Sequence, residues 1–136
     1  MAEQPSRPTG GLTPYLTIRD GRGTEACTFY ERAFAADIIE RNFAEDGKRL
    51  MHAGMKINDG WLMLSDEFPE YGQAALPPAS VGLHLQVDDA DAWFGRAIDA
   101  GCTATMPVSD MFWGDRYGQL TDPFGHSWSI GSPIKA

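Results

Sequence analysis

The chain has 136 residues, 43% of them hydrophobic, which fits one domain of ordinary composition and leaves no room for two independent cores. Its formal net charge of −8 opposes binding to nucleic acid and anionic membranes and would favour a cationic ligand. No apolar run approaches the roughly 20 residues of a membrane span. Two scattered cysteines suggest neither a disulfide framework nor a zinc site, so we expect a cytoplasmic protein.

The first half of the chain predicts a strand, a helix and three further strands. Residues 1–11 are polar and rich in Pro and Gly, and we expect a disordered lead. Residues 14–18 alternate polar and apolar, as a half-buried strand does. A helix capped by Thr24 is expected next, because apolar residues recur at helical spacing. These residues are Ala26, Phe29, Tyr30, Ala33 and Phe34. Three strands joined by tight turns follow at 38–43, 49–57 and 61–65.

The second half repeats this order. Residues 81–87 alternate as a strand, and Asp88 or Asp89 caps a helix that Gly101 ends. The apolar positions of this helix have the same spacing as those of the first: Ala90, Trp93, Phe94, Ala97 and Ile98. Three strands follow at 103–108, 117–121 and 127–130. The sequence therefore predicts one α+β domain at 12–136, made of two tandem βαβββ modules, 12–66 and 81–131, joined by a proline-containing linker at 67–80.

Several segments carry a family resemblance that covers nearly the whole chain. They include Met51-His52-Ala53, Val87-Asp88-Asp89-Ala90-Asp91, Trp113-Gly114-Asp115-Arg116 and Asp122-Pro123-Phe124-Gly125-His126. Together they resemble the vicinal oxygen chelate superfamily of glyoxalases, extradiol dioxygenases and bleomycin resistance proteins, and most of all its PhnB-like, glyoxalase-like branch. The resemblance implies that the two modules form an incomplete eight-stranded, barrel-like cleft that binds small molecules, and that the protein is a homodimer.

The resemblance also implies where a metal would be bound. The metal enzymes of the superfamily place His, Glu or Gln ligands on the first and last strand of each module. The corresponding positions here fall near Thr13, Met63, Gly82 and Ser129. None of these residues offers the imidazole or carboxylate that Zn²⁺, Ni²⁺ or Fe²⁺ prefers. We therefore expect no metal ligands and no cofactor.

Two residues are candidates for catalysis. His84 shares a strand face with Gln86 by alternation, and it is either a general base or ligand-orienting donor, or a histidine without chemistry at the cleft edge. Arg116 either grips a carboxylate or phosphonate, or forms an ion pair with Asp115 or Asp110 that holds its hairpin.

Other residues are candidates for ligand contact because alternation places them on the cleft side or at its mouth. Aromatic and hydroxyl groups in a concave site suit a flat, partly apolar molecule. The candidates are Tyr15, Thr17, His52, Trp61, Met63, Gln86, Trp113 and Ser129. For Trp61 and Met63, simple filling of space is an equally good interpretation.

Two classes of function remain open from the sequence. The first is a protein that binds a cationic or oxygen-rich small molecule without a catalytic metal, as bleomycin resistance proteins do. The second is a glyoxalase-like lyase or isomerase, with or without a divalent metal, that acts on a small oxygen-rich substrate with His84 as base. The empty ligand positions favour the first class.

Overall fold

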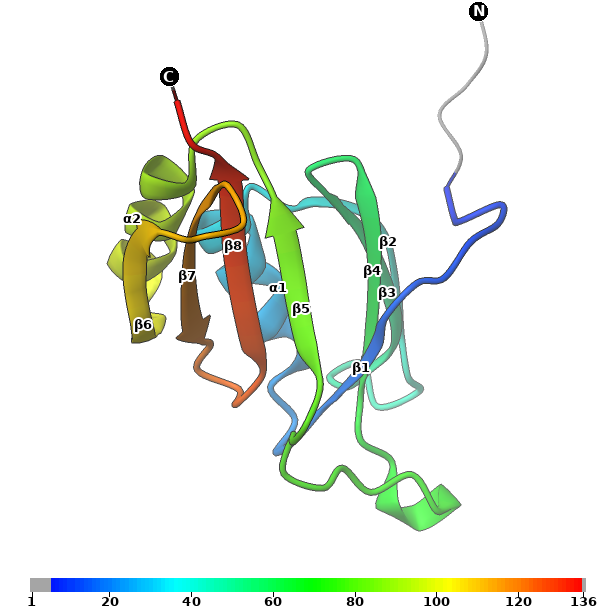
Figure 1. Cartoon of the computed structure of the whole chain (residues 1–136). Coiled ribbons are helices and arrows are strands. Elements are labelled where there is room, and N and C mark those ends of the chain that lie inside the picture. The colour runs from blue at the N-terminus through cyan, green and yellow to red at the C-terminus, as the bar shows by residue number, and fades with distance from the viewer. Residues whose placement is uncertain (1–5, 136) are drawn as a thin grey trace, which may run out of the picture. The chain divides into compact units, whose positions relative to one another are not determined.

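The computed structural model describes residues 6–135 and divides them into two compact units (Figure 1). One unit comprises Ala35–Leu76 and the chain up to Glu31, and the other comprises Arg32–Phe34 and the chain from Pro77 onward. The boundary at 76/77 falls inside the expected linker. Residues 1–5 of the expected disordered lead lie outside the described residues, and residues 6–11 form no helix or strand.

The first unit is a four-stranded sheet with a helix between its first two strands. Its elements are β1 (Tyr15–Ile18), α1 (Gly23–Phe34), β2 (Asp37–Phe43), β3 (Leu50–Ile57) and β4 (Gly60–Asp66). The strand order is β1-β4-β3-β2, in which only the β1–β4 pair is parallel. The linker holds one 3₁₀ turn, η1 (Pro69–Tyr71).

The second unit has the same topology. Its elements are β5 (Gly82–Gln86), α2 (Ala90–Ala100), β6 (Thr103–Asp110), β7 (Asp115–Thr121) and β8 (Ser127–Pro133). The strand order is β5-β8-β7-β6, again with one parallel pair, β5–β8. This confirms the α+β fold of two tandem βαβββ modules. Among the described residues, the eight strands form two four-stranded sheets and no closed barrel. The cleft expected between the modules stays a prediction.

The last strand of each module holds the beginning of that module's helix. Asp66 at the end of β4 accepts a hydrogen bond from the Gly23 amide at 2.7 Å, and Ser132 on β8 accepts one from the Ala90 amide at 3.0 Å. Both acceptors are buried and satisfy amides that a helix cannot pair internally. The predicted cap Thr24 is wrong, because α1 already begins at Gly23, with its first amide held by Asp66.

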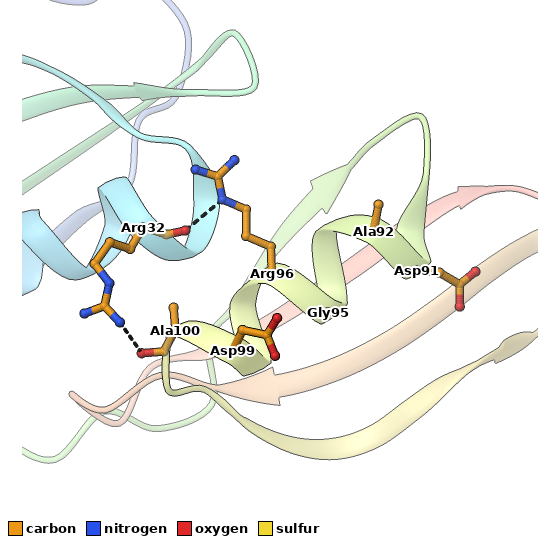
Figure 2. A pocket seen from close by; sticks show the side chains of 7 residues that line it. All are labelled: Arg32, Asp91, Ala92, Gly95, Arg96, Asp99 and Ala100. Carbon is orange, nitrogen blue, oxygen red and sulfur yellow. Dashed lines mark hydrogen bonds between the residues drawn. The ribbon is translucent and has the colours of Figure 1, made fainter.

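The last turn of α1 packs in the second unit. Phe34 stacks on Trp128 of β8 with ring centroids 4.3 Å apart, and both side chains are buried. Arg96 of α2 donates from Nε to the Arg32 carbonyl at 2.7 Å (Figure 2). Trp128 thus packs against the last turn of α1. Within the described residues, neither helix is long and apolar enough to cross a membrane.

Candidate functional site

Four polar side chains form a hydrogen-bonded chain across three strands of the second sheet. His84 Nδ1 lies 2.7 Å from Ser129 Oγ, and His84 Nε2 lies 2.8 Å from Gln86 Oε1. Gln86 Nε2 then donates to Asp115 Oδ2 at 3.2 Å. His84 and Gln86 are exposed, while Ser129 and Asp115 are half-buried. We call these four residues the His84 array.

The chemistry of the array determines where its protons lie. An ionised Asp115 only accepts hydrogen bonds, so Gln86 turns its NH₂ group toward Asp115 and its carbonyl toward His84. His84 therefore donates from Nε2, and when the ring is neutral this leaves Nδ1 as an acceptor for the Ser129 hydroxyl. The array thus presents a serine hydroxyl to an imidazole held in one tautomer.

Strand register explains why these residues meet. His84 is the ladder partner of Ser129 on β8, and Ser129 is in turn the partner of Gln119 on β7. Gly131 lies between Gln86 and Tyr117 in the same sheet. A Cβ at Gly131 would lie 3.1 Å from Gln86 Oε1 and 3.2 Å from His84 Cε1. Glycine at this position therefore leaves the space that the array occupies.

A cavity of about 440 Å³ lies on the same sheet, next to the array. Its wall combines hydroxyl, amide and aromatic groups and includes no charged side chain: Ser80, Val81, Gly82, Thr105, Tyr117, Gln119, Leu120, Thr121, Ser127, Trp128 and Ser129. Gly82 and Ser129 stand at two positions where the resemblance implies metal ligands. Because the small glycine stands at one of them, the cavity extends over this part of the sheet.

Aromatic rings border the array. The Tyr117 ring stacks on His84 with centroids 6.0 Å apart, and Trp113 meets Tyr117 edge to face at 5.4 Å. Trp113 is 51% exposed, so half of its surface is available to a ligand. The predicted residues His84, Gln86, Ser129 and Trp113 are thus brought together by the second sheet.

The first sheet carries a related pair of rings. Tyr15 Oη lies 3.1 Å from His52 Nδ1, and the two rings are 5.7 Å apart. Tyr15 pairs in register with Met63, as His84 pairs with Ser129. One strand further, Met63 pairs with Gly54 and Ser129 pairs with Gln119, and His52 and Tyr117 each precede that partner by two residues. The two modules therefore place a tyrosine and a histidine at equivalent positions, with the residue types exchanged.

The remaining predicted residues of the first module lie on the same face as this pair. Thr17 follows Tyr15 by two residues on β1, and Trp61 precedes Met63 by two on β4. The Trp61 ring lies under the Lys56 ammonium, which is 5.3 Å from its centroid. His52 also has the Glu40 carboxylate 3.9 Å from its Nε2. These residues form a polar and aromatic surface within their own sheet.

The structure does not bring Arg116 to the His84 array. Alternation along β7 puts Asp115 and Tyr117 on the array face and Arg116 on the helix side of the sheet. There it donates to both carboxylate oxygens of Asp91, at 2.7 and 3.0 Å, and to Asp110 at 2.9 Å. Hydrogen bonds from Arg116 lower the pKa of Asp91. The predicted ion pair of Arg116 with Asp110 is confirmed, and the alternative partner Asp115 is wrong. The ion pair with Asp91 was not predicted from the sequence.

Other hollows are lined by arginines that already bind groups of this chain. Arg32 and Arg96 donate to backbone carbonyls beside the hollow on α2 that Figure 2 shows. In the first module, Arg49 beside a cavity of about 510 Å³ pairs with Asp46 and Glu70. Neither hollow has an array comparable to that of His84.

The resemblance implies metal ligands at four positions, and the side chains present there can be tested against the ligands that a divalent metal prefers. Thr13 and Ser129 offer a neutral hydroxyl, Met63 a thioether and Gly82 no side chain. Divalent catalytic metals prefer imidazole and carboxylate ligands, so this set does not fit such a metal. Across residues 6–135, no three side chains of His, Cys, Asp or Glu gather in an arrangement that would hold an ion.

Sequence reasoning missed part of the site. Tyr117, Gln119 and Thr121 line the cavity by simple alternation along β7. A bulge at the glycine-containing beginning of this strand would have moved them to the other face. In the structure β7 pairs with β8 without any shift, and the irregular pairings lie between β6 and β7. Asp115 as the end of the array had no signal in the sequence.

Comparison with known proteins agrees with this architecture. The sequence profile of the Glyoxalase/Bleomycin resistance protein/Dioxygenase superfamily matches residues 13–130, and the chain belongs to this superfamily. It is 42% identical to the Mycobacterium bovis protein Mb0911c, in a match that covers 91% of this chain and 84% of that protein. The crystal structure of PA1353 from Pseudomonas aeruginosa is similar, with a TM-score of 0.74, 25% identity and coverage of 93% of this chain and 100% of that one. The PhnB protein of Bacillus cereus shares the fold, with a TM-score of 0.70, 18% identity and coverage of 90% and 99%.

Proposed function

We propose that this protein binds an uncharged, oxygen-rich small molecule with a ring in the cavity beside the His84 array, without a catalytic metal. The observation that carries the proposal is the contact of a cavity of about 440 Å³ with a polar array whose donors and acceptors are already oriented. Pockets that combine apolar walls with a few placed polar groups are typical of small-molecule sites.

The lining favours an uncharged ligand over a cationic one. Its hydroxyl side chains and the Gln119 amide offer donors and acceptors to hydroxyl or carbonyl groups of a ligand. A ring of the ligand fits against the exposed edge formed by Tyr117 and Trp113. Asp115, the one acid of the array, is directed to Gln86, so its charge is already partly compensated by a hydrogen bond. The net charge of −8 alone supports a cationic ligand.

Tyr15, Thr17, His52, Trp61 and Met63 remain predicted ligand-binding residues of the first module. Their common face and the Tyr15–His52 contact support this role. A homodimer remains an expectation from the family, as does a cytoplasmic location from the cysteine usage.

Thermal unfolding with chosen probes tests the proposal. Phenyl β-glucoside and catechol represent uncharged oxygen-rich rings, bleomycin a cationic glycopeptide, and methylphosphonate an anion. We expect the uncharged rings to raise the unfolding midpoint by a few degrees, because a ligand of the native state stabilises it. If only bleomycin raised the unfolding midpoint, the proposed uncharged ligand would be wrong and a cationic ligand would be indicated. A shift that persists unchanged in His84→Ala would place the site elsewhere.

Elemental analysis of the purified protein tests the metal part separately. We expect no stoichiometric divalent metal. One tightly bound equivalent of Zn²⁺, Ni²⁺ or Fe²⁺ would overturn this part of the proposal and favour the alternative, a metal-dependent lyase or isomerase.

A further inference from the structure

We propose that Ser129 is an acyl-accepting nucleophile, with His84 as its general base, and that the site transfers or hydrolyses the acyl group of small uncharged esters. The inference rests on the proposed function in one respect, since the ester would occupy the same cavity. Its basis is the geometry of the His84 array. Ser129 Oγ lies 2.7 Å from His84 Nδ1, within the range for proton transfer from a nucleophile to its base.

The base has the orientation that such a reaction requires. An unpaired imidazole rotates and exchanges tautomers, whereas His84 is held on its far side by Gln86 at 2.8 Å. Gln86 is held in turn by Asp115 at 3.2 Å. A nucleophile, a base and a third group that orients the base are the recurring elements of serine nucleophile sites on unrelated folds. Here an amide stands between the base and the carboxylate.

Ser129 differs from the two other serines on its strand. Ser127 pairs in register with Gly82, which has no side chain to accept its proton. Ser132 is buried and accepts the Ala90 amide at the beginning of α2. Ser129 is half-buried, lines the cavity and contacts an imidazole. It is therefore the serine of β8 that both meets a ligand and has a base.

The reaction balances with water as the only co-reactant. Ser129 Oγ attacks the ester carbonyl carbon, a C–O bond forms, and the hydroxyl proton moves to His84 Nδ1. The tetrahedral intermediate then expels the alcohol oxygen, which takes that proton from His84, and an acyl-Ser129 ester remains. Water attacks this ester by the same route and releases the acid. Gln119, the ladder partner of Ser129, carries the amide donor for the developing oxyanion, since its Nε2 holds a second hydrogen besides the one given to Tyr117.

The lining selects the substrate class. The cavity wall includes no charged side chain, so esters without a charge fit it better than anionic or cationic ones. An alcohol or acyl part with a ring would lie against Tyr117. Phenyl acetate and its nitro derivative, p-nitrophenyl acetate, satisfy both conditions.

Acylation by p-nitrophenyl acetate, followed by intact mass and peptide mapping, tests the inference. We expect one acetyl group per chain, mapped to Ser129 and to neither Ser127 nor Ser132. Ser129→Ala should abolish the adduct, and His84→Ala should slow its formation about 100-fold or more. Ser109→Ala removes an exposed serine of β6 outside the cavity and should acylate like the unaltered protein. Circular dichroism checks that each variant is folded.

The outcomes separate this inference from the proposed function. Acetyl groups spread over several serines or lysines would contradict the assignment of Ser129 as the nucleophile. An adduct at Ser129 that forms at the same rate in His84→Ala would contradict the assignment of His84 as its base and overturn the inference. Phenyl β-glucoside would still shift the unfolding midpoint if only the nucleophile were wrong. Acylation at Ser129 without any thermal shift by the uncharged rings would overturn the binding proposal and leave the nucleophile supported.

Discussion

His84 Nδ1 and Ser129 Oγ form a hydrogen bond at 2.7 Å, and this contact joins the first strand of the second module to its last. The two residues are separated by 45 positions in the chain. They meet because β5 and β8 are neighbouring parallel strands with His84 and Ser129 in register. Gln86 contacts the opposite nitrogen of the same ring, so the imidazole is held from both sides.

Asp115→Asn should change the tautomer of His84. An asparagine side chain has a donor of its own, so Gln86 is no longer forced to direct its amide toward this position. A reversed Gln86 would donate to Nε2 and move the imidazole proton to Nδ1. We expect ¹⁵N NMR to show one Nε2–H tautomer in the unaltered protein and a mixture in the variant. An Nδ1–H tautomer in the unaltered protein would contradict the proton positions assigned to the His84 array.

Arg116→Met should lower thermal stability slightly and leave ligand binding unchanged. Arg116 ties Asp91 in the first turn of α2 to Asp110 at the end of β6, at the surface, where ion pairs contribute little. We expect the melting temperature to fall by a few degrees at most. The shift caused by phenyl β-glucoside should be retained, because Arg116 lies on the face opposite His84. If a folded Arg116→Met variant lost that shift, Arg116 would have to contribute to ligand binding after all.

The ion pair between Arg116 and Asp91 should contribute less to stability as the pH falls. Arg116 lowers the pKa of Asp91 from its ordinary value of 3.8. The contribution of the pair is therefore present above this pH and is lost as the pH falls through the lowered value. Below about pH 4, Arg116→Met should lose less stability with acidification than the unaltered protein does, as measured by urea unfolding. Parallel acid curves would contradict this role.

Gly23→Ala and Gly95→Ala should have opposite effects. A Cβ at Gly23 would lie 2.7 Å from Asp66 Oδ2, a buried carboxylate that also holds the Leu50 amide. We expect a loss of about 1–3 kcal/mol in the free energy of unfolding. A Cβ at Gly95 of α2 meets nothing within 4 Å, so alanine there should add roughly 0.5–1 kcal/mol. Urea unfolding measures both, and equal changes would contradict the close approach at Gly23.

Asp122→Ala should destabilise the second module more than Asp122→Asn. Asp122 Oδ1 accepts the Phe124 and His126 amides at 2.9 and 3.0 Å, and Oδ2 accepts Trp128 Nε1 at 2.9 Å. Alanine leaves three donors without this acceptor, at a cost of about 3–5 kcal/mol, whereas asparagine retains an oxygen for the amides and should cost about 1–2 kcal/mol. Chemical unfolding followed by Trp fluorescence distinguishes the two. Equal losses would show that the Trp128 bond carries most of the stability.

The two thiols should be unreactive in the native protein. Burial raises the pKa of Cys27 to about 11 and that of Cys102 to about 12. At pH 8 both remain protonated, and we expect a disulfide reagent such as DTNB to react far more slowly than with the chain in guanidinium. Because these values exceed the ordinary 9.0, the stability linked to the protonated thiols is present below pH 9 and is lost as the pH rises toward 11–12. Cys27→Ala with Cys102→Ala should flatten that alkaline loss, and rapid labelling at pH 8 would contradict the burial.

Local patterns in the sequence determined the module architecture. Apolar residues at helical spacing marked α1 and α2, and turn residues marked the hairpins, because both signals are set by neighbours a few positions apart. The face of short strands was predictable for the same reason, as His84 with Gln86 shows.

The tertiary structure decided which of these faces meet and where each helix begins. The sequence pattern left the role of Arg116 open, since a shift of one residue in the register of β7 reverses the face of each of its side chains. The register of β7 with β8 places the Asp115 side chain in the His84 array. It directs the Arg116 side chain to the opposite face of the sheet, where it contacts Asp91. Likewise α1 begins at Gly23 because Asp66, 43 positions away, accepts its first amide. Strand register and helix ends depend on partners distant in the chain, so local periodicity does not determine them.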